Sequence, residues 1–295
     1  MTPLITRRAV VVAGAGAALA SCSFQPDRDH AGRDAPASLP LARKPRIAWV
    51  LGSGGPRGVV HVGVLKAMEE LGLEPDLIVG ASIGAVAGVL RASGMNCSAL
   101  IDLALNVSPW AIGRLAWGTS ERISSLGVAD WVSAQIDGKR LQDLPVPMAA
   151  VAHNQPKNQL IAFTAGNAAM AVAASCAIEG RLTPVRIRGD LHVDADLHQP
   201  LPVRLAKQLG ADRIMAVDVS AHESDAPPGT ERWRPADLRK RALTLPDSRA
   251  ADVLLHPDSG YYASLARGHR EVMIEVGYRT AMAQAEKLKA LHALA

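Results

Sequence analysis

Apolar runs alternate with amphipathic stretches along the chain from residue 46 onward. Residues 46 to 51 read RIAWVL, a continuous apolar run typical of a strand that is buried on both faces. In residues 59 to 71 apolar positions recur every three residues, which predicts a helix. A short strand at 77 to 79 and a small-residue helix at 81 to 92 follow. This alternation predicts parallel strands joined by right-handed crossovers, and hence an α/β sheet.

The rest of the chain continues the same mixture of strands and helices. A polar, proline-rich stretch at 221 to 235 predicts a loop or a mobile flap. The other predicted elements are two strands within 148 to 163, a helix at 167 to 178, a hairpin at 185 to 193 turning at Gly189-Asp190, a strand at 214 to 219 and an amphipathic helix at 272 to 294.

The first 22 residues have the pattern of an export signal. Arg7 and Arg8 precede an uncharged stretch, residues 9 to 20, that is too short to span a bilayer as a stable helix. The paired arginines fit a twin-arginine signal. The following LASC resembles a bacterial lipoprotein box, which predicts acylation of Cys22. A plain cleaved signal peptide and an uncleaved anchor are the alternatives.

Residues 23 to 45 are polar, contain prolines and have no apolar period, so they predict a flexible tether. The folded domain is then expected to occupy residues 46 to 295. Together with the signal, this predicts an exported protein on the periplasmic side of the cell envelope, held at a membrane surface through Cys22.

Composition and charge exclude several classes of protein. The chain is 48% hydrophobic and 20% charged, as in ordinary globular proteins. Its net charge of +4 comes from 32 basic and 28 acidic residues without a long basic run, so nucleic-acid binding is not expected. No HExxH motif, cysteine cluster or acidic loop is present, so neither a metal nor a cofactor is expected. Cys97 and Cys176 would be permitted to pair in an exported compartment, although their apolar contexts favour buried, unpaired thiols.

One serine stands in the pattern of a nucleophile elbow. The sequence GASIGA places Ser82 between Gly80 and Gly84, directly after a predicted strand and directly before a predicted helix. Such a turn raises a serine hydroxyl above the sheet edge, and glycines make room where side chains would collide. The competing interpretation is a serine that only caps the helix.

A glycine-rich loop follows the first predicted strand. GSGGPRG would place backbone N–H groups at the start of a helix, where they can bind an anion or an oxyanion. It fits neither the dinucleotide fingerprint nor the P-loop pattern. An oxyanion hole fits better, with a fixed positive charge from the arginine. The candidate residues are Gly52, Ser53, Gly54, Gly55, Arg57 and Gly58.

With both motifs in place, the sequence resembles the patatin-like phospholipase family. The resemblance rests on GSGGPRGVVHVGVLKAMEE and GASIGA, and it continues through VDADLHQPLPV, LGADRIMAVDVS and ADVLLHP. It implies a three-layer α/β fold whose mainly parallel sheet is flanked by helices. It also implies a phospholipase or lipid esterase with a Ser-Asp dyad, whose nucleophile would be Ser82 and whose general base would be Asp194.

The chain departs from the family where the aspartate is usually followed by glycines. Ala195 and Asp196 stand there instead. If either position needed a positive φ, a side chain would cost about 1 kcal/mol. On extended backbone, Asp194 and Asp196 would share a face, and their repulsion would raise the pKa of one carboxyl group. Asp196 is therefore a candidate modulator.

Two functional hypotheses follow from these residues. The first is an enzyme in which Asp194 accepts the Ser82 proton, Ser82 attacks an acyl ester of a membrane lipid, and N–H groups of Gly54 and Gly55 hold the oxyanion. An ordinary aspartate is a weak base toward an alcohol, so this site must be partly dry. The second is a lipid-binding envelope protein that has lost turnover through its Asp-Ala-Asp sequence. Its protein partners cannot be named from the sequence.

Histidines and tryptophans offer weaker candidates. His256 lies late in the chain, where an α/β-hydrolase keeps its base, and it would complete a conventional triad. His61 is expected to pack in the core, and His192 and His198 flank the Asp194 motif. Trp110, Trp117 and Trp131 would form an acyl pocket, a lid or part of the core, and Trp233 would lie on the flap.

Overall fold

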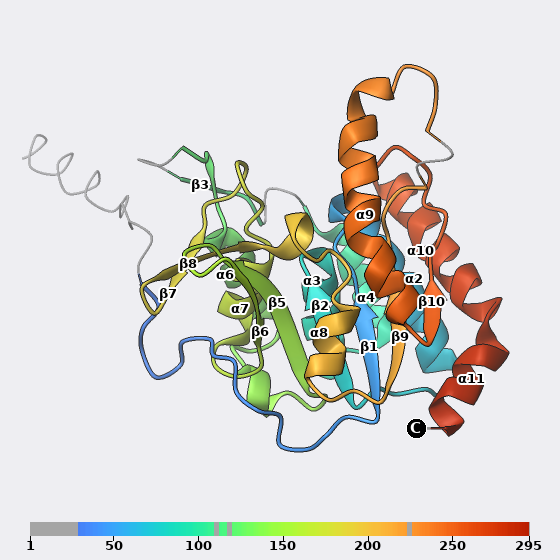
Figure 1. Cartoon of the computed structure of the whole chain (residues 1–295), viewed down its shortest axis with the longest axis horizontal. Helices are drawn as coiled ribbons and strands as arrows, with labels where there is room; N and C mark the ends of the chain where they lie inside the picture. Colours follow the sequence, from blue (N-terminus) through green and yellow to red (C-terminus); the bar gives the residue numbers. More distant parts are fainter. Residues whose placement is uncertain (1–28, 109–111, 117–119, 223–225, 295) are drawn as a thin grey trace, which may run out of the picture.

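The computed structural model describes residues 29–108, 112–116, 120–222 and 226–294. One eight-stranded sheet forms the middle layer, with helices on both faces (Figure 1). This architecture agrees with the predicted α/β fold. The export signal, Cys22, Trp110 and Trp117 lie outside the described residues.

The sheet has a parallel half and an antiparallel half. The strand order is β10-β9-β1-β2-β5-β8-β7, with β6 paired to β5. Strands β10, β9, β1, β2 and β5 run parallel, whereas β6, β7 and β8 are antiparallel to their neighbours. The strands of the sheet are β1 (Ile47–Leu51), β2 (Leu77–Ala81), β5 (Met148–Asn154), β6 (Gln159–Phe163), β7 (Val185–Ile187), β8 (Asp190–Asp194), β9 (Arg213–Val217) and β10 (Val253–Leu255).

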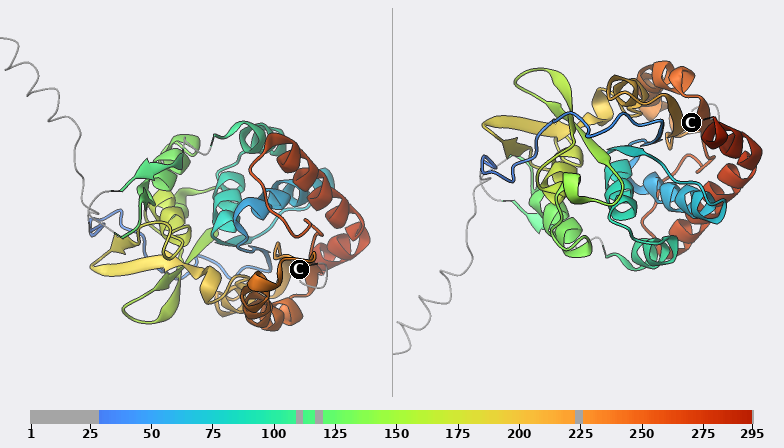
Figure 2. Two further views of the ribbon diagram at one scale, coloured as in Figure 1. Left: turned by 90° about the horizontal axis from the view of Figure 1, so that it is seen from above. Right: turned by 90° about the horizontal axis from the view of Figure 1, so that it is seen from below.

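Different helices cover the two faces of the sheet, as the views from above and below in Figure 2 show. The larger core cluster lies on the face covered by α2 (Val60–Glu70), α3 (Ile83–Ala92), α4 (Cys97–Asn106), α6 (Leu126–Gln135), α7 (Ala168–Ser175), α10 (Arg267–Met282) and α11 (Ala285–Ala293). The smaller cluster lies under α8 (Val203–Gln208) and the end of α9 (Arg234–Ala250). β1 and β2 are fully buried between these layers, as their apolar runs predict.

Short elements complete the fold. The 3-10 turns are η1 (Gly55–Val59), η2 (Leu141–Asp143), η3 (Ala195–Leu197) and η5 (Glu231–Trp233), and β3 (Arg114–Leu115) pairs with β4 (Ile123–Ser124) in a separate two-stranded sheet. No helix within the described ranges has both the length and the apolar character needed to cross a bilayer.

The described part of the predicted tether is bound to the domain. Within residues 29–45, His30 N–H donates to the Arg186 carbonyl at 3.0 Å, and Ala37 N–H donates to the Ala165 carbonyl at 2.9 Å. Ala35 is only 5% exposed. The expectation of a free tether is therefore wrong for residues 29–45, because backbone hydrogen bonds hold a segment that has no apolar period of its own.

Two helical segments also differ from the sequence expectation. The single helix expected at the C-terminus is divided between α10 and α11. The whole stretch from 234 to 250 forms a 17-residue helix, α9, that the sequence pattern does not indicate. Its apolar residues form no stripe, only Thr244 and Asp247 are buried, and Pro246 lies inside it.

Candidate active site

Ser82 lies on a sharp strand-to-helix turn between β2 and α3. Its backbone has φ 54° and ψ −124°, a conformation that costs energy for a residue with a side chain. The Ser82 N–H donates to Ser175 Oγ at 2.9 Å, and Ser175 Oγ in turn donates to the Val151 carbonyl at 2.5 Å. A Cβ atom at Gly84 would lie 2.1 Å from the Leu51 carbonyl oxygen. The geometry required of a nucleophile elbow is therefore present.

Strand pairing brings Asp194 beside this turn. The strands β2 and β8 share one edge of β5: Ala81 is opposite Val151, and Asp194 is opposite the next residue, Ala152. Since β2 runs parallel to β5 and β8 runs antiparallel to it, their carboxyl ends meet at this point. Asp194 therefore ends β8 where Ser82 follows β2.

Burial changes the chemistry of the Asp194 carboxyl group. Asp194 is 3% exposed, and this burial raises its pKa to about 7; hydrogen bonding from the Ser82 side chain opposes the rise. Asp194 Oδ1 accepts the Asp196 N–H at 2.9 Å. Among the described residues, Oδ2 has no partner of regular hydrogen-bond geometry, so it is free to receive a proton. The dry site that a carboxylate base requires is present.

Asp196 turns away from Asp194 toward the glycine-rich loop. Its carboxylate accepts a hydrogen bond from Ser53 Oγ and pairs with Lys240 on α9. The pKa of Asp196 lies below its ordinary value: burial opposes this shift, and the charge of Lys240 is the largest of the influences that lower it. The Asp196 carboxylate in turn adds to the rise in the pKa of Asp194.

The expectation of extended backbone after Asp194 is wrong. Residues 195 to 197 form the 3-10 turn η3 instead of extended chain, and the Asp194 side chain caps it. Neither Ala195 nor Asp196 has a positive φ. The glycines that the family usually has are therefore not required here by backbone conformation.

The glycine-rich loop offers fewer free donors than its sequence suggests. The N–H of Gly52 donates to the Val217 carbonyl at 3.0 Å, and the N–H of Ser53 donates to the Pro200 carbonyl at 2.8 Å. These two groups cannot also bind an oxyanion. Gly54 and Gly55 remain as the candidate donors of this loop, and Gly55 adopts φ 55°, which favours glycine.

His61 forms a hydrogen bond to the backbone of this loop. It is fully buried on α2, and its Nε2 lies 2.8 Å from the Gly52 carbonyl oxygen. Burial lowers its pKa to about 4, so the ring is neutral near pH 7 and Nε2–H donates to that oxygen. The predicted core histidine therefore also positions the candidate oxyanion loop.

Arg57 and Gly58 have different surroundings from those expected of oxyanion donors. Arg57 Nη2 donates to the Tyr261 carbonyl, and Arg57 lines a polar cavity of about 270 Å³ rather than the cavity beside Ser82. Gly58 packs against Ile83, where a Cβ atom would lie 2.1 Å from Ile83 Cγ2. The expectation of an Arg57 charge at the oxyanion is not supported by this geometry.

The structure does not bring His256 to Ser82. His256 lines the polar cavity, where its Nε2 lies 3.0 Å from the Ser220 carbonyl oxygen and its ring stacks on His222. His192 is buried against Phe163. Trp233 is 41% exposed on η5, under the Arg232 guanidinium.

The two described cysteines are unpaired and buried. Burial raises the pKa of the Cys97 thiol to about 12, and burial together with the Asp194 charge raises that of Cys176 well above its usual value. Cys176 lies beside Ser82 and keeps its proton, so it is not a competing nucleophile. Its proximity to Ser82, like that of Ser175, is missed by sequence reasoning because α7 carries no motif.

An apolar cavity of about 370 Å³ opens at Ser82. Its size lies within the range of small-molecule and lipid sites. Trp131, one of the three tryptophans expected near an acyl pocket, lines it. Other lining residues include Val62, Leu90, Leu103, Cys176 and Leu265. The site thus places the Ser82 hydroxyl at the wall of an apolar cavity, with the buried Asp194 carboxyl group beside this serine.

Comparison with known proteins agrees with this arrangement. The sequence profile of the patatin-like phospholipase family matches residues 49–207. The chain belongs to the patatin-like phospholipase family. An uncharacterized NTE family protein of Mycobacterium bovis is 31% identical over 233 residues, which cover 75% of this chain and 64% of that protein.

Other patatin-like relatives are larger. Lysophospholipase NTE1 of Pyricularia oryzae is 25% identical across 82% of this chain and 18% of its own length. Mouse patatin-like phospholipase domain-containing protein 7 is 27% identical across 79% of this chain and 20% of its own length. This chain therefore spans less than two thirds of the mycobacterial relative and about a fifth of the other two.

The fold of this family also appears among solved structures. VipD from Legionella pneumophila superposes with a TM-score of 0.50 at 13% identity, covering 92% of this chain and 73% of VipD. The predicted patatin-like fold is thereby confirmed.

Proposed function

We propose that this chain is a serine acyl hydrolase that cleaves acyl esters of membrane lipids. The observation that carries the proposal is the buried Asp194 carboxyl group, with a pKa of about 7, beside a strained Ser82 on the wall of an apolar cavity. A base whose pKa lies near neutrality is matched to proton abstraction at neutral pH. The cavity is suited to an acyl chain.

The proposed reaction has two steps. Asp194 Oδ2 accepts the Ser82 proton while Ser82 Oγ attacks the ester carbonyl carbon, and the N–H groups of Gly54 and Gly55 hold the oxyanion. The alcohol leaves with the proton that Asp194 received. Water then attacks the acyl-serine with Asp194 as base, which releases the fatty acid and restores the hydroxyl.

The second hypothesis, lipid binding without turnover, rested on Ala195 and Asp196. The negative φ angles at both positions remove the backbone objection. The Lys240 partner of Asp196 removes much of the electrostatic objection, because it neutralises the added carboxylate. Both observations favour the enzyme over the inactive alternative.

Lipid substrates also fit the rim of the cavity. Leu265 lines it and is 52% exposed, and Ile178 lines it and is 36% exposed. Exposed aliphatic side chains at a cavity mouth are suited to contact with a lipid surface. We further propose export to the cell envelope and membrane attachment through an acylated Cys22, which would hold this mouth near its substrate.

The proposal is tested with acyl esters of graded chain length. The full chain should release fatty acid, and Ser82→Ala and Asp194→Asn should each lower kcat by at least about 10³-fold. Ser98→Ala, an exposed serine on α4, is the matched control and should keep wild-type activity. Lipid binding by wild type without any release of fatty acid would support the inactive alternative.

The anchor needs a separate experiment. Cells grown with a fatty-acid analogue should label the wild-type chain and should not label Cys22→Ala. Equal labelling of both chains would contradict acylation at Cys22 and would leave the hydrolase proposal intact.

A further inference from the structure

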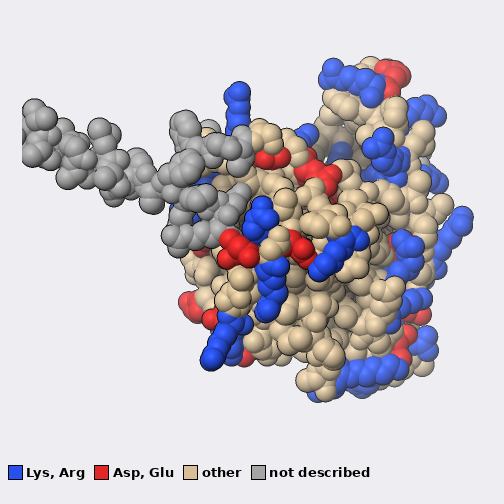
Figure 3. All heavy atoms as spheres, turned by 60° about the vertical axis from the view of Figure 1, so that its left-hand side comes forward, with Lys and Arg blue, Asp and Glu red and all other residues tan. Residues whose placement is uncertain are grey.

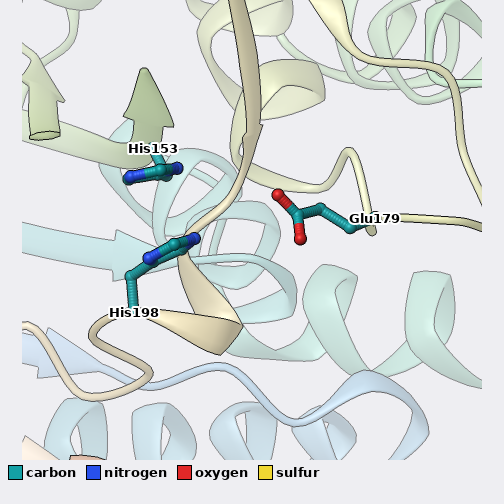
Figure 4. A group of neighbouring side chains, drawn as sticks. All are labelled: His153, Glu179 and His198. Atoms are coloured by element: carbon teal, nitrogen blue, oxygen red, sulfur yellow. The ribbon is translucent and has the colours of Figure 1, made fainter. Parts of the chain in front are cut away.

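Two histidines and a glutamate converge on the face of the sheet opposite the Ser82 cavity. Figure 4 shows the rings of His153 and His198 stacked, with the Glu179 carboxylate directed toward their edges. His153 follows Val151 on the face that α8 covers, whereas Asp194 is paired with Ala152. The cluster therefore lies behind the base of the proposed reaction and takes no part in it.

The three side chains are close enough to share one ion. Their ligand atoms all lie within 4.8 Å of one another, and no other such group of three occurs in the described parts of the chain. They come from the end of β5, the loop after α7 and the loop after η3. These segments are distant in sequence, so the cluster is created by the fold.

Hydrogen bonding leaves His153 with a bare ring nitrogen. Its Nε2 lies 3.2 Å from Asn158 Oδ1, an acceptor, so Nε2 carries the proton and Nδ1 keeps its lone pair. His153 is only 5% exposed, and its Nδ1 is buried without a partner among the described residues. A buried lone pair held in this way is suited to bind a metal ion.

His198 presents a second atom of the same kind. Its Nε2 is also buried without a partner among the described residues. Burial of two imidazole nitrogens without hydrogen-bond partners costs folding free energy, unless a bound ion interacts with them.

We propose that His153, His198 and Glu179 form a binding site for a divalent transition-metal ion of the zinc class. Two imidazoles and one carboxylate are a ligand set that zinc prefers, whereas calcium and magnesium prefer oxygen alone. Water would complete a four-coordinate ion. His153 Nδ1, His198 Nε2 and a Glu179 oxygen are the ligand atoms.

Binding requires a rotation of a side chain. The ring centroids are 3.4 Å apart and the planes differ by 14°, while an ion lies in the plane of each imidazole that binds it. The partly exposed His198 ring must therefore turn about its Cβ–Cγ bond, a broad torsion for histidine, while Asn158 keeps the His153 ring in place. An ion can arrive from the surface cavity of about 350 Å³ that His198 lines with Gln199 and Leu205.

A bound ion would brace the loop that follows the proposed base. His198 is four residues after Asp194, and the ion would tie it to β5 and to the loop after α7. The expected effect is higher stability of this corner of the domain.

The test uses the full chain, stripped with EDTA and titrated with ZnCl₂ in a calorimeter and in thermal unfolding. One zinc should bind per chain, and at about 100 times Kd the Tm should rise by roughly 5 °C or more. Cobalt in place of zinc should give visible absorption of a four-coordinate nitrogen and oxygen site. Elemental analysis of the dialysed protein gives the stoichiometry independently.

Variants distinguish zinc binding at this site from zinc binding at other histidines of the chain. His198→Ala and Glu179→Gln, both partly exposed, should each remove the saturable zinc site and its Tm shift. Asn158→Gly, which suits the φ of 47° at that position, should weaken zinc about 10-fold or more by freeing the His153 tautomer. His222→Ala, in the other stacked histidine pair, is the matched control and should bind like wild type. Zinc binding that is unchanged in both His198→Ala and Glu179→Gln, or absent from wild type, overturns the proposal.

Discussion

At the residue scale, Asp196 supports the candidate site, although its position in the sequence suggests that it would disturb the site. A second carboxylate two residues from a catalytic aspartate would ordinarily disturb it. Here Lys240 neutralises Asp196, and Ser53 ties it to the glycine-rich loop. Burial is the main cause of the raised pKa of Asp194, but the charges of Asp196 and Lys240 also shift it, so their removal should be visible in the pH dependence of the proposed reaction.

Charge removal around Asp194 should move the acidic limb of kcat/KM in opposite directions. The wild-type limb is expected at an apparent pKa of about 7. Asp196→Asn removes an anion, which should lower the pKa of Asp194 and shift the limb to lower pH. Lys240→Met removes a cation and should shift it to higher pH, each by about half a unit or more. Shifts in the same direction for both variants would contradict this account, and Ser98→Ala should show none.

Asp194→Asn should stabilise the fold at alkaline pH while it abolishes the proposed activity. The pKa of Asp194 is about 7 in the folded chain and about 3.9 when unfolded, so the folded state binds the proton more tightly. Wild-type stability therefore falls as pH rises between these values, by an order of magnitude of 2 to 4 kcal/mol. An asparagine does not titrate and should avoid this loss.

Urea unfolding of both chains at about pH 5 and about pH 8 measures the effect. The advantage of Asp194→Asn should be larger at the higher pH. An advantage that is equal at both pH values would show that burial of the charge is not its cause.

At the element scale, the sequence predicts the helices and strands that have a clear apolar pattern and does not predict those that lack one. β1, β2, α2 and α3 were predictable because buried apolar runs and a three-residue period record their environment directly. α9 was not, because a helix that buries only Thr244 and Asp247 leaves no apolar stripe. The division between α10 and α11 falls at Ala283 and Gln284, residues that favour helix and give no stop signal.

Some residues of the candidate site could likewise be predicted from the sequence, and others could not. Ser82, Asp194 and the glycine-rich loop stand in motifs, so their sequence was enough to propose them. Lys240 could not be found, because its role depends on an unpredicted helix. The zinc-class cluster joins positions 153, 179 and 198, whose spacing matches no motif, and it exists only after β5 and η3 are placed together.

α9 is held by one buried carboxylate, and removal of this group should be costly. Asp247 is fully buried and accepts from Gln199 Nε2 and the Arg204 N–H, each at 2.7 Å, and from the Arg204 guanidinium. Asp247→Ala would leave these donors without an acceptor. It should cost about 3 kcal/mol and lower the Tm by roughly 5 to 10 °C.

The effect should extend to catalysis, since α9 also carries Lys240. The Tm and kcat/KM should both decline in Asp247→Ala. Arg249→Ala, at an exposed residue two positions later on the same helix, should change neither. A normal Tm for Asp247→Ala would mean that α9 is held by other contacts.

At the scale of the whole molecule, charged side chains are unevenly distributed over the surface. Basic and acidic side chains are interspersed with uncharged ones on the face in Figure 3, and basic ones gather at the top and along the right-hand side. α9 carries four exposed arginines, which are Arg234, Arg239, Arg241 and Arg249. Exposed basic side chains are attracted to anionic lipid surfaces.

The segment from 29 to 45 extends the folded unit beyond the boundary that the apolar pattern indicates. Asp34 carbonyl oxygen accepts the Asn167 N–H at 2.7 Å, and Ala37 exchanges hydrogen bonds with the strand end near Ala165. These contacts fasten the segment to β6 and to the start of α7. A chain that begins at residue 46 should therefore be less stable than one that begins at residue 29.

The expected difference is about 2 kcal/mol or more, since several backbone hydrogen bonds at about 1 kcal/mol each are offset by the cost of ordering the segment. Urea unfolding of the two truncated chains measures it, and a chain that begins at residue 29 with Ala37→Pro is the matched variant. Proline removes the N–H that Ala165 accepts, so this variant should lose part of the same stability. Equal stability of all three chains would restore the flexible tether that the sequence predicts, and it would move the domain boundary back to residue 46.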